Sequence, residues 1–262
     1  MSEENRKAIR ISVRNLVEFV LRSGDIDNRR SGNAQKDAML AGGRIHRKIQ
    51  KRMGSGYRAE VPLKHEVQDE EQEITLLVEG RADGIFTENG IPVIDEIKGM
   101  YTDISRLEEP IEVHLAQAMC YGYFYCCDKD LDGIRLQMTY CNLETEEIKR
   151  FQTDRSREEL ETWFSSVVHE YFKWARYLYH HELTRDASIG HLEFPFPYRA
   201  GQRDLVVSVY RTVSRKKRLF IQAPTGIGKT LSTVFPAVRA IGEGKGDKLF
   251  YLTAKTVTRT VA

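Results

Sequence analysis

The chain of 262 residues is poor in the features that mark disulfide-rich and membrane-spanning proteins. It has four cysteines, and no apolar run reaches the roughly 20 residues that a transmembrane helix needs. The cysteines, at positions 120, 126, 127 and 141, form no Cys-x-x-Cys pair, which argues against a zinc knuckle or a disulfide framework. The N-terminus is charged and leads into no signal-type apolar stretch. We therefore expect a cytoplasmic protein with reduced cysteines and no membrane partner.

An excess of charge of one sign is also missing, because 40 Lys and Arg residues oppose 38 Asp and Glu residues. The net charge of +2 does not by itself indicate a nucleic-acid-binding protein. Residues 44–52 and 215–218 are nevertheless dense in Lys and Arg. Such clusters occur on nucleic-acid-binding surfaces and also on ordinary solvated faces. Composition therefore permits contact with nucleic acid without requiring it.

Apolar periodicity predicts an α/β domain over residues 1–188. Helical spacing predicts helices over residues 13–21, 34–53, 112–127 and 156–179. Runs rich in Val, Ile and Leu predict strands over residues 57–67, 73–86, 91–97, 131–141 and 147–151. Asn89-Gly90, a strong turn signal, predicts a hairpin between the second and third of these strands.

A proline-rich segment at residues 194–198 interrupts this pattern and places a domain boundary at about residue 188. The pattern beyond it predicts a helix, a strand, a phosphate loop, a second helix and a second strand, over residues 202–213, 218–222, 223–230, 230–241 and 248–253. Residues 189–262 are therefore predicted to be a partial β-α-β segment of a P-loop, RecA-like domain.

Two acidic residues on neighbouring predicted strands, with a lysine after the second, form a candidate site. Asp83 and Glu96 offer the oxygen ligands that Mg²⁺ prefers. A divalent cation held there would polarise a phosphodiester and activate water. Lys98 shares a face with Glu96 because side chains alternate along a strand, and its ammonium could stabilise the charged transition state. Asp95 would face the other way, where it needs hydrogen bonds or water.

Two predicted helices supply further candidates. Gly42 and Gly43 precede His46 by one helical turn and leave its surroundings free of side chains, so that a strand, a metal ion or a nucleic-acid backbone could approach. On a later helix, Gln117 and Tyr121 lie four residues apart on one face and could hold a DNA phosphate or base.

With these residues in this order, residues 13–180 resemble the PD-(D/E)xK nuclease superfamily in its RecB-like branch. The resemblance implies a restriction-endonuclease-like fold, in which a mixed sheet is flanked by helices. It also implies that the protein acts on DNA, single-stranded or branched. It also implies that His46, Asp83 and Glu96 bind Mg²⁺ or Mn²⁺, that Asp83, Glu96 and Lys98 carry the catalysis, and that Gln117 and Tyr121 contact DNA. Some members hold an iron–sulfur cluster on four cysteines, but the cysteine spacing differs here and we expect no cluster.

The segment 223–230, Ala-Pro-Thr-Gly-Ile-Gly-Lys-Thr, follows a predicted strand and opens a predicted helix, as a Walker A loop does. Gly226 and Gly228 let main-chain N–H groups surround phosphates. Lys229 would reach the β- and γ-phosphates and Thr230 would bind Mg²⁺. We therefore predict an ATP site that includes Thr225 and these four residues.

The flanking segments resemble superfamily 2 helicases of the XPD/DinG branch. Residues 196–202 resemble the element that reads adenine through a glutamine, which implies that Gln202 binds the nucleotide. Residues 251–256 resemble helicase motif Ia, which implies that Lys255 contacts DNA. No Walker B acid follows Thr230. We therefore expect a fragment of a nuclease–helicase fusion, active in DNA repair or processing, whose ATPase is inactive.

Two other functions remain compatible with the sequence. The nuclease fold could have lost catalysis and serve only to load DNA onto the helicase. Alternatively, the chain could be a P-loop ATPase without a nucleic-acid role. Thermal protection by Mg²⁺ or Mn²⁺ that is abolished by Asp83→Ala would favour the nuclease over the inactive DNA-loading module. Salt-dependent DNA binding would exclude the ATPase without a nucleic-acid role.

Overall fold

The structure, a computed structural model, describes residues 6–24, 32–69, 71 and 73–253. The chain divides into two compact units, Met1–Arg176 and Tyr177–Ala262. The division falls within a helix, whereas the sequence placed the boundary at about residue 188. In the described part of the chain, no helix is long and apolar enough to cross a membrane.

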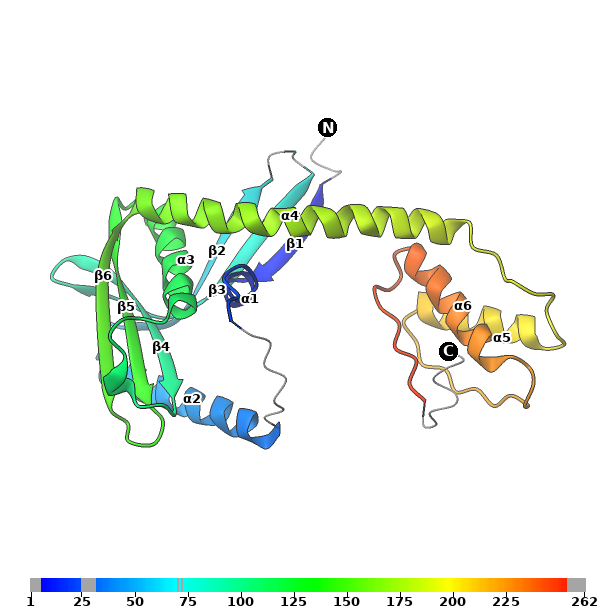
Figure 1. Cartoon of the computed structure of the whole chain (residues 1–262), viewed down its shortest axis with the longest axis horizontal. Helices are drawn as coiled ribbons and strands as arrows, with labels where there is room; N and C mark the ends of the chain where they lie inside the picture. Colours follow the sequence, from blue (N-terminus) through cyan, green and yellow to red (C-terminus); the bar gives the residue numbers. More distant parts are fainter. Residues whose placement is uncertain (1–5, 25–31, 70, 72, 254–262) are drawn as a thin grey trace. The chain divides into compact units, whose positions relative to one another are not determined.

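A six-stranded mixed sheet forms the centre of the first unit (Figure 1). Its strands are β1 (Lys7–Ser12), β2 (Arg58–Gln68), β3 (Ile74–Glu88), β4 (Ile91–Met100), β5 (Gly133–Asn142) and β6 (Ile148–Ser156). They follow the order β1-β3-β4-β5-β6, and β2 pairs with β3. The β1–β3 and β4–β5 pairs are parallel and the other pairs are antiparallel. The expected α/β class, with a mixed sheet flanked by helices, is confirmed.

Strand β3 is long enough to pair with two strands along one edge. It pairs with β1 over residues 74–79 and with β4 over residues 84–88, while β2 occupies its other edge. Residues 80–83 therefore lie between the two pairings, where the edge carries no strand. The β3–β4 connection is the expected hairpin, in which Asn89 and Gly90 have φ of 51° and 81°, as a type I′ turn requires.

Within the described residues, four α-helices accompany the sheet and each begins near a position that the sequence indicates, whereas a 3₁₀ turn at residues 104–106 was not predicted. They are α1 (Val13–Val20), α2 (Gly32–Arg52), η2 (Ile104–Arg106), α3 (Glu112–Lys129) and α4 (Arg157–Gly190). The hydroxyl of Ser12 caps α1 by accepting from the main-chain N–H of Asn15 at 3.1 Å. Strand β1, which precedes α1, was not predicted, because its six residues alternate charged and apolar side chains only briefly.

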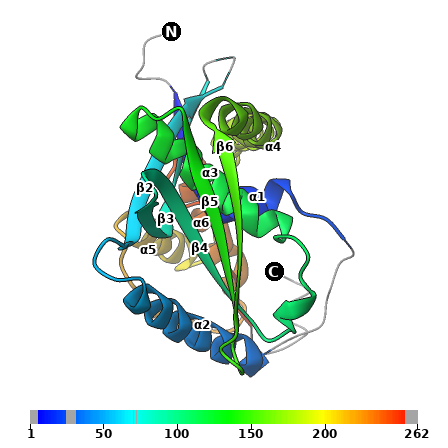
Figure 2. The ribbon, with the colours of Figure 1, turned by 90° about the vertical axis from the view of Figure 1, so that its left-hand side faces the viewer.

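Helices α2 and α3 bury the two faces of β4. On one face Ile45 and Ile49 of α2 pack against Ile97 and Cys141, which lie toward the C-terminal ends of β4 and β5. Figure 2 shows α2 beside the ends of these strands. Helix α3 lies against the sheet so closely that a Cβ at Gly122 would stand 2.8 Å from Leu136 Cδ2. Because β4 is covered on both sides, its polar side chains need partners within the protein.

The second unit contains α5 (Gln202–Ser214) and α6 (Lys229–Gly242) after the end of α4. Residues 218–222 and 248–253, which the sequence predicted to be strands, are irregular, so this prediction is wrong. A strand requires main-chain partners on a neighbouring strand, and the described residues supply none here. The apolar side chains stay in solvent: Phe220 is 95% exposed, Phe250 77% and Leu252 90%.

Candidate active site

The candidate site lies where β3 leaves β1 and begins to pair with β4. Asp83 stands at this point, one residue before the first β3–β4 pair, Gly84 with Asp95. Its carboxylate Oδ2 accepts a hydrogen bond of 2.7 Å from the main-chain N–H of Ile97. The side chain of Asp83 thus substitutes for a strand partner of β4, and this fixes the carboxylate beside Glu96.

Glu96 is almost fully buried, with 4% of the residue exposed. Its Oε1 accepts from Lys98 Nζ at 2.8 Å, and the same ammonium donates to Gln117 Oε1 at 2.8 Å. Its Oε2 is buried without a hydrogen-bond partner among the described residues. Burial, followed by the negative charge of Asp83, raises the pKa of Glu96 to about 7, although Lys98 opposes the shift.

Helix α2 brings His46 to the other side of Asp83. Its Nδ1 lies 3.3 Å from Asp83 Oδ1. Burial lowers the pKa of His46, but the hydrogen bond and charge of Asp83 outweigh this effect and the net change is upward. The helix approaches β4 closely at Gly42, whose Cα would stand 3.6 Å from a Cβ on Gly99. The expected close approach beside His46 is therefore made by a strand.

Gln50 is a residue of the site that sequence reasoning missed. Its Nε2 donates to the main-chain oxygen of Asp83 at 3.0 Å. Helix α2 therefore contacts both the carboxylate of Asp83, through His46, and the backbone of Asp83, through Gln50. Its position four residues after His46, on the same helix face, was the available signal.

The donor set fits a hard divalent cation. Two carboxylates and an imidazole converge, and the buried Oε2 of Glu96 is an acceptor that lacks a donor. Among the described side chains, however, no group of three His, Cys, Asp or Glu residues already has the spacing of a metal centre. Binding of a cation by all three side chains would therefore require them to rearrange.

In the first unit, the two residues that were expected to contact DNA lie inside the protein. Gln117 and Tyr121 are each 5% exposed. Gln117 orients Lys98, as described above, and Tyr121 lies against Gly80, where a Cβ would stand 2.6 Å from its hydroxyl oxygen. His114, one turn before Gln117, lies 3.4 Å from the Tyr140 hydroxyl. In this structure these residues contact other side chains and the backbone of the first unit.

A buried polar network holds Asp95 on the opposite face of β4. Asp95 is fully buried and accepts from Thr139 Oγ1 at 2.6 Å, from Tyr57 OH at 2.9 Å and from Gln137 Nε2 at 3.0 Å. Burial raises the pKa of Asp95 in spite of these donors. The expected hydrogen-bonded setting is thereby confirmed, and the network anchors the strand that carries Glu96 and Lys98.

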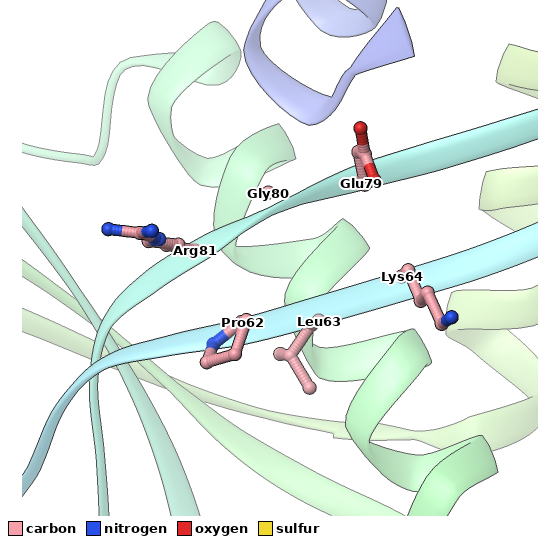
Figure 3. Close-up of a pocket in the computed structure, with 6 residues that line it drawn as sticks. All are labelled: Pro62, Leu63, Lys64, Glu79, Gly80 and Arg81. Atoms are coloured by element: carbon pink, nitrogen blue, oxygen red, sulfur yellow. The ribbon is translucent and has the colours of Figure 1, made fainter. Parts of the chain in front are cut away.

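A surface pocket of about 500 Å³ opens along β2 and β3, next to the site (Figure 3). It is lined by Pro62, Leu63, Lys64, Glu79, Gly80 and Arg81. These residues flank the part of β3 that lies between its two pairings. The candidate catalytic side chains are not among them, so the pocket is a neighbour of the site and not the site itself.

In the second unit, the predicted phosphate loop precedes α6. Gly226 and Gly228 have φ of 89° and 79°, a conformation that side chains disfavour. Lys229 begins α6, and its ammonium donates to the main-chain oxygens of Ala223 at 3.0 Å and Pro224 at 2.9 Å. The side chain of Lys229 thus folds back onto the loop that precedes it.

Gln202, the predicted adenine reader, touches this loop. It is 4% exposed, its Oε1 accepts from the main-chain N–H of Arg199 at 3.0 Å, and a Cβ on Gly228 would stand 2.7 Å from its Nε2. Thr230 Oγ1 lies 3.3 Å from the Tyr251 hydroxyl, whereas Thr225 is exposed. Lys255 lies outside the described residues.

Comparisons with known proteins give a short sequence similarity and a distant structural similarity. No protein-family model matches the chain. Over 52 residues it is 36% identical to a probable ATP-dependent helicase of Methanocaldococcus jannaschii. This match covers 19% of the chain and 8% of the helicase, so the chain spans a small part of that relative. The crystal structure of SSO0001 is similar with a TM-score of 0.40 at 17% identity, over 64% of this chain and 78% of that one.

Proposed function

We propose that the first unit is a metal-dependent DNA nuclease of the restriction-endonuclease-like fold. We further propose that the second unit is the nucleotide-binding start of an ATP-dependent DNA helicase that acts in DNA repair or processing. The observation that carries the nuclease is the group of Asp83, Glu96 and Lys98, in which Glu96 is buried and one of its carboxylate oxygens lacks a partner among the described residues. An unpartnered buried carboxylate oxygen is costly unless something binds it.

A divalent cation held by Asp83, Glu96 and His46 would polarise the phosphodiester and lower the pKa of an attacking water. Lys98 is held in a fixed orientation by Glu96 and Gln117. Its ammonium would face the non-bridging oxygens, where negative charge develops in the transition state. His46 contacts the carboxylate of Asp83, and Gln50 donates to its main-chain oxygen, so both fix the position of Asp83.

The test is cleavage of end-labelled single-stranded, duplex and branched DNA with Mg²⁺ or Mn²⁺. We expect Asp83→Ala and Lys98→Ala each to reduce cleavage by about 100-fold or more. Glu66→Ala, which removes an exposed carboxylate from β2, is the matched control and should cut normally. Cutting without added metal, or cutting that survives Asp83→Ala, would contradict the proposal.

A DNA-binding module without catalysis is the second candidate. It is favoured by the His46–Asp83 contact, which occupies two of the three proposed ligands. Salt-dependent DNA binding without cleavage under any condition, and without thermal protection by Mn²⁺, would establish this function instead.

The helicase proposal rests on the loop geometry and on the similarity of 52 residues to a helicase. Gly226, Gly228 and Lys229 would bind the phosphates, Thr230 would bind Mg²⁺ and Gln202 would read the base. Binding of a fluorescent ATP analogue should be lost in Lys229→Ala. Lys245→Ala, which replaces a lysine just beyond the C-terminal end of α6, should leave binding unchanged. Equal binding by both variants would refute the site.

A further inference from the structure

Five cations form a stripe along the exposed side of α2. Arg44, Arg47, Lys48, Lys51 and Arg52 follow one another at spacings of three, one, three and one residues, and all five are exposed. In an α-helix this spacing places the side chains on one face. We call this face the basic stripe.

The opposite contacts of α2 fix the orientation of the stripe. Ile45 and Ile49 are 7% and 2% exposed and pack against β4 and β5, while His46 and Gln50 contact Asp83 on another flank. The helix therefore cannot rotate to bury its cations. The basic stripe and His46, a candidate metal ligand, therefore belong to the same helix.

The charge pattern differs from that of an ordinary solvated helix face. Such faces commonly alternate in sign, as in α4, where Lys173 pairs with Glu170. In the stripe, neighbours at three and four residues are of like charge and repel one another. Lys48 pairs with Glu146, and within the described residues the other four cations have no ion pair. A concentration of unpaired cations that repel one another indicates an anionic partner.

We propose that the basic stripe binds the phosphate backbone of DNA and holds it at a distance from the cutting site. From Arg44 to Arg52 the helix rises by eight residue steps of about 1.5 Å, which is about 12 Å. One strand of duplex DNA carries a phosphate about every 3.4 Å, so the stripe can face three or four phosphates. Because His46 lies on another flank of α2, these phosphates lie away from the scissile one. The inference rests on the proposed function for its choice of DNA, but not on catalysis.

The experiment measures binding in the absence of cutting. Fluorescence anisotropy of labelled single-stranded and duplex DNA is followed in EDTA, between about 50 and 200 mM salt, with wild type and the triple variant Arg44→Gln, Arg47→Gln, Lys51→Gln. Lys48 and its partner stay intact. We expect the affinity of the triple variant for DNA at 100 mM salt to be about 10- to 100-fold lower than that of wild type. The slope of log K against log salt should become shallower by an amount that corresponds to about two to three phosphate contacts.

The matched control removes the same charge elsewhere on the first unit. Arg106→Gln, Lys129→Gln, Lys173→Gln together replace three exposed cations, each of which already pairs with a neighbouring carboxylate. This variant should bind within about threefold of wild type. Equal affinity and equal salt slope in the two triple variants would overturn the proposal, and circular dichroism establishes that both are folded.

Failure of the stripe and failure of the nuclease give different results. If the nuclease proposal is wrong but the stripe is right, DNA remains intact with metal while the stripe variant still loses affinity in EDTA. If the stripe is wrong, the stripe variant binds like its control, whether or not the wild type cuts DNA.

Discussion

The substitution Glu96→Gln tests the site through the stability of the metal-free protein. Glu96 is nearly fully buried, lies beside Asp83 and has one oxygen without a partner. Glutamine has almost the same shape and can still accept from Lys98 through its Oε1. The change therefore removes the buried negative charge while it preserves the packing.

The magnitude follows from the pKa. In the folded protein the pKa of Glu96 rises from its ordinary 4.5 to about 7. A tenfold change in a protonation equilibrium is worth about 1.4 kcal/mol, so ionised Glu96 lowers the free energy of unfolding by about 3 kcal/mol. Because the folded state binds the proton more tightly, stability from this group is greatest below pH 4.5, falls between pH 4.5 and 7, and is lowest above pH 7.

The assay is urea denaturation of wild type and Glu96→Gln in EDTA at pH 5 and at pH 8. We expect the variant to gain about 1–3 kcal/mol over wild type at pH 8 and much less at pH 5, where wild-type Glu96 is largely protonated. Addition of Mn²⁺ at pH 8 should stabilise wild type, because the cation binds only the folded carboxylate, but should leave the variant nearly unchanged.

Two results would refute this reasoning. A variant that is equally or less stable than wild type at pH 8 would show that the charge of Glu96 is already compensated within the protein. Equal stabilisation of wild type and variant by Mn²⁺ would show that the cation binds elsewhere. The control Glu66→Gln, at an exposed position on β2, should change neither quantity.

Three further predictions concern the scaffold. Thr139→Val leaves buried Asp95 without its shortest donor and should lower the free energy of unfolding by about 1–3 kcal/mol in urea; an unchanged value would contradict the network. Gly84→Ala should destabilise by about 1–3 kcal/mol or more, since its Cβ would stand 1.8 Å from Tyr57 Cζ, and the loss should shrink if Tyr57→Ala is added. The His114 ring should titrate in NMR near its pKa of about 4, lowered by burial and then by Lys98, so that its contribution to stability is lost as the pH falls from 6.5 toward 4; titration near 6.5 would refute its burial.

Local patterns in the sequence were sufficient for most elements of the first unit. The alternation of Ile74, Leu76 and Val78 marks the buried face of β3, and each of these side chains is fully buried. Asn89 and Gly90 specify the hairpin through residues that accept a left-handed backbone. The strand period also places Glu96 and Lys98 on one face, where they form a hydrogen bond.

The same reasoning failed where an element depends on distant partners. Residues 218–222 have the composition of a strand, but composition cannot supply the neighbouring strand that would satisfy the main chain, and Phe220 remains in solvent. Strand β1 was missed for the converse reason. Its six residues give a weak local signal, and pairing with β3 is what makes them a strand.

The sequence by itself determined which residues supply carboxylates, imidazole and ammonium, because their chemistry and their spacing along helices and strands are local properties. Only the tertiary structure decided how they meet. The edge of β3 is divided between β1 and β4, and Asp83 lies where the pairing changes, so its carboxylate binds the backbone of β4. Gln117 was expected to face DNA, yet the packing of α3 turns it onto Lys98. Such contacts join residues far apart in the chain, and no local period encodes them.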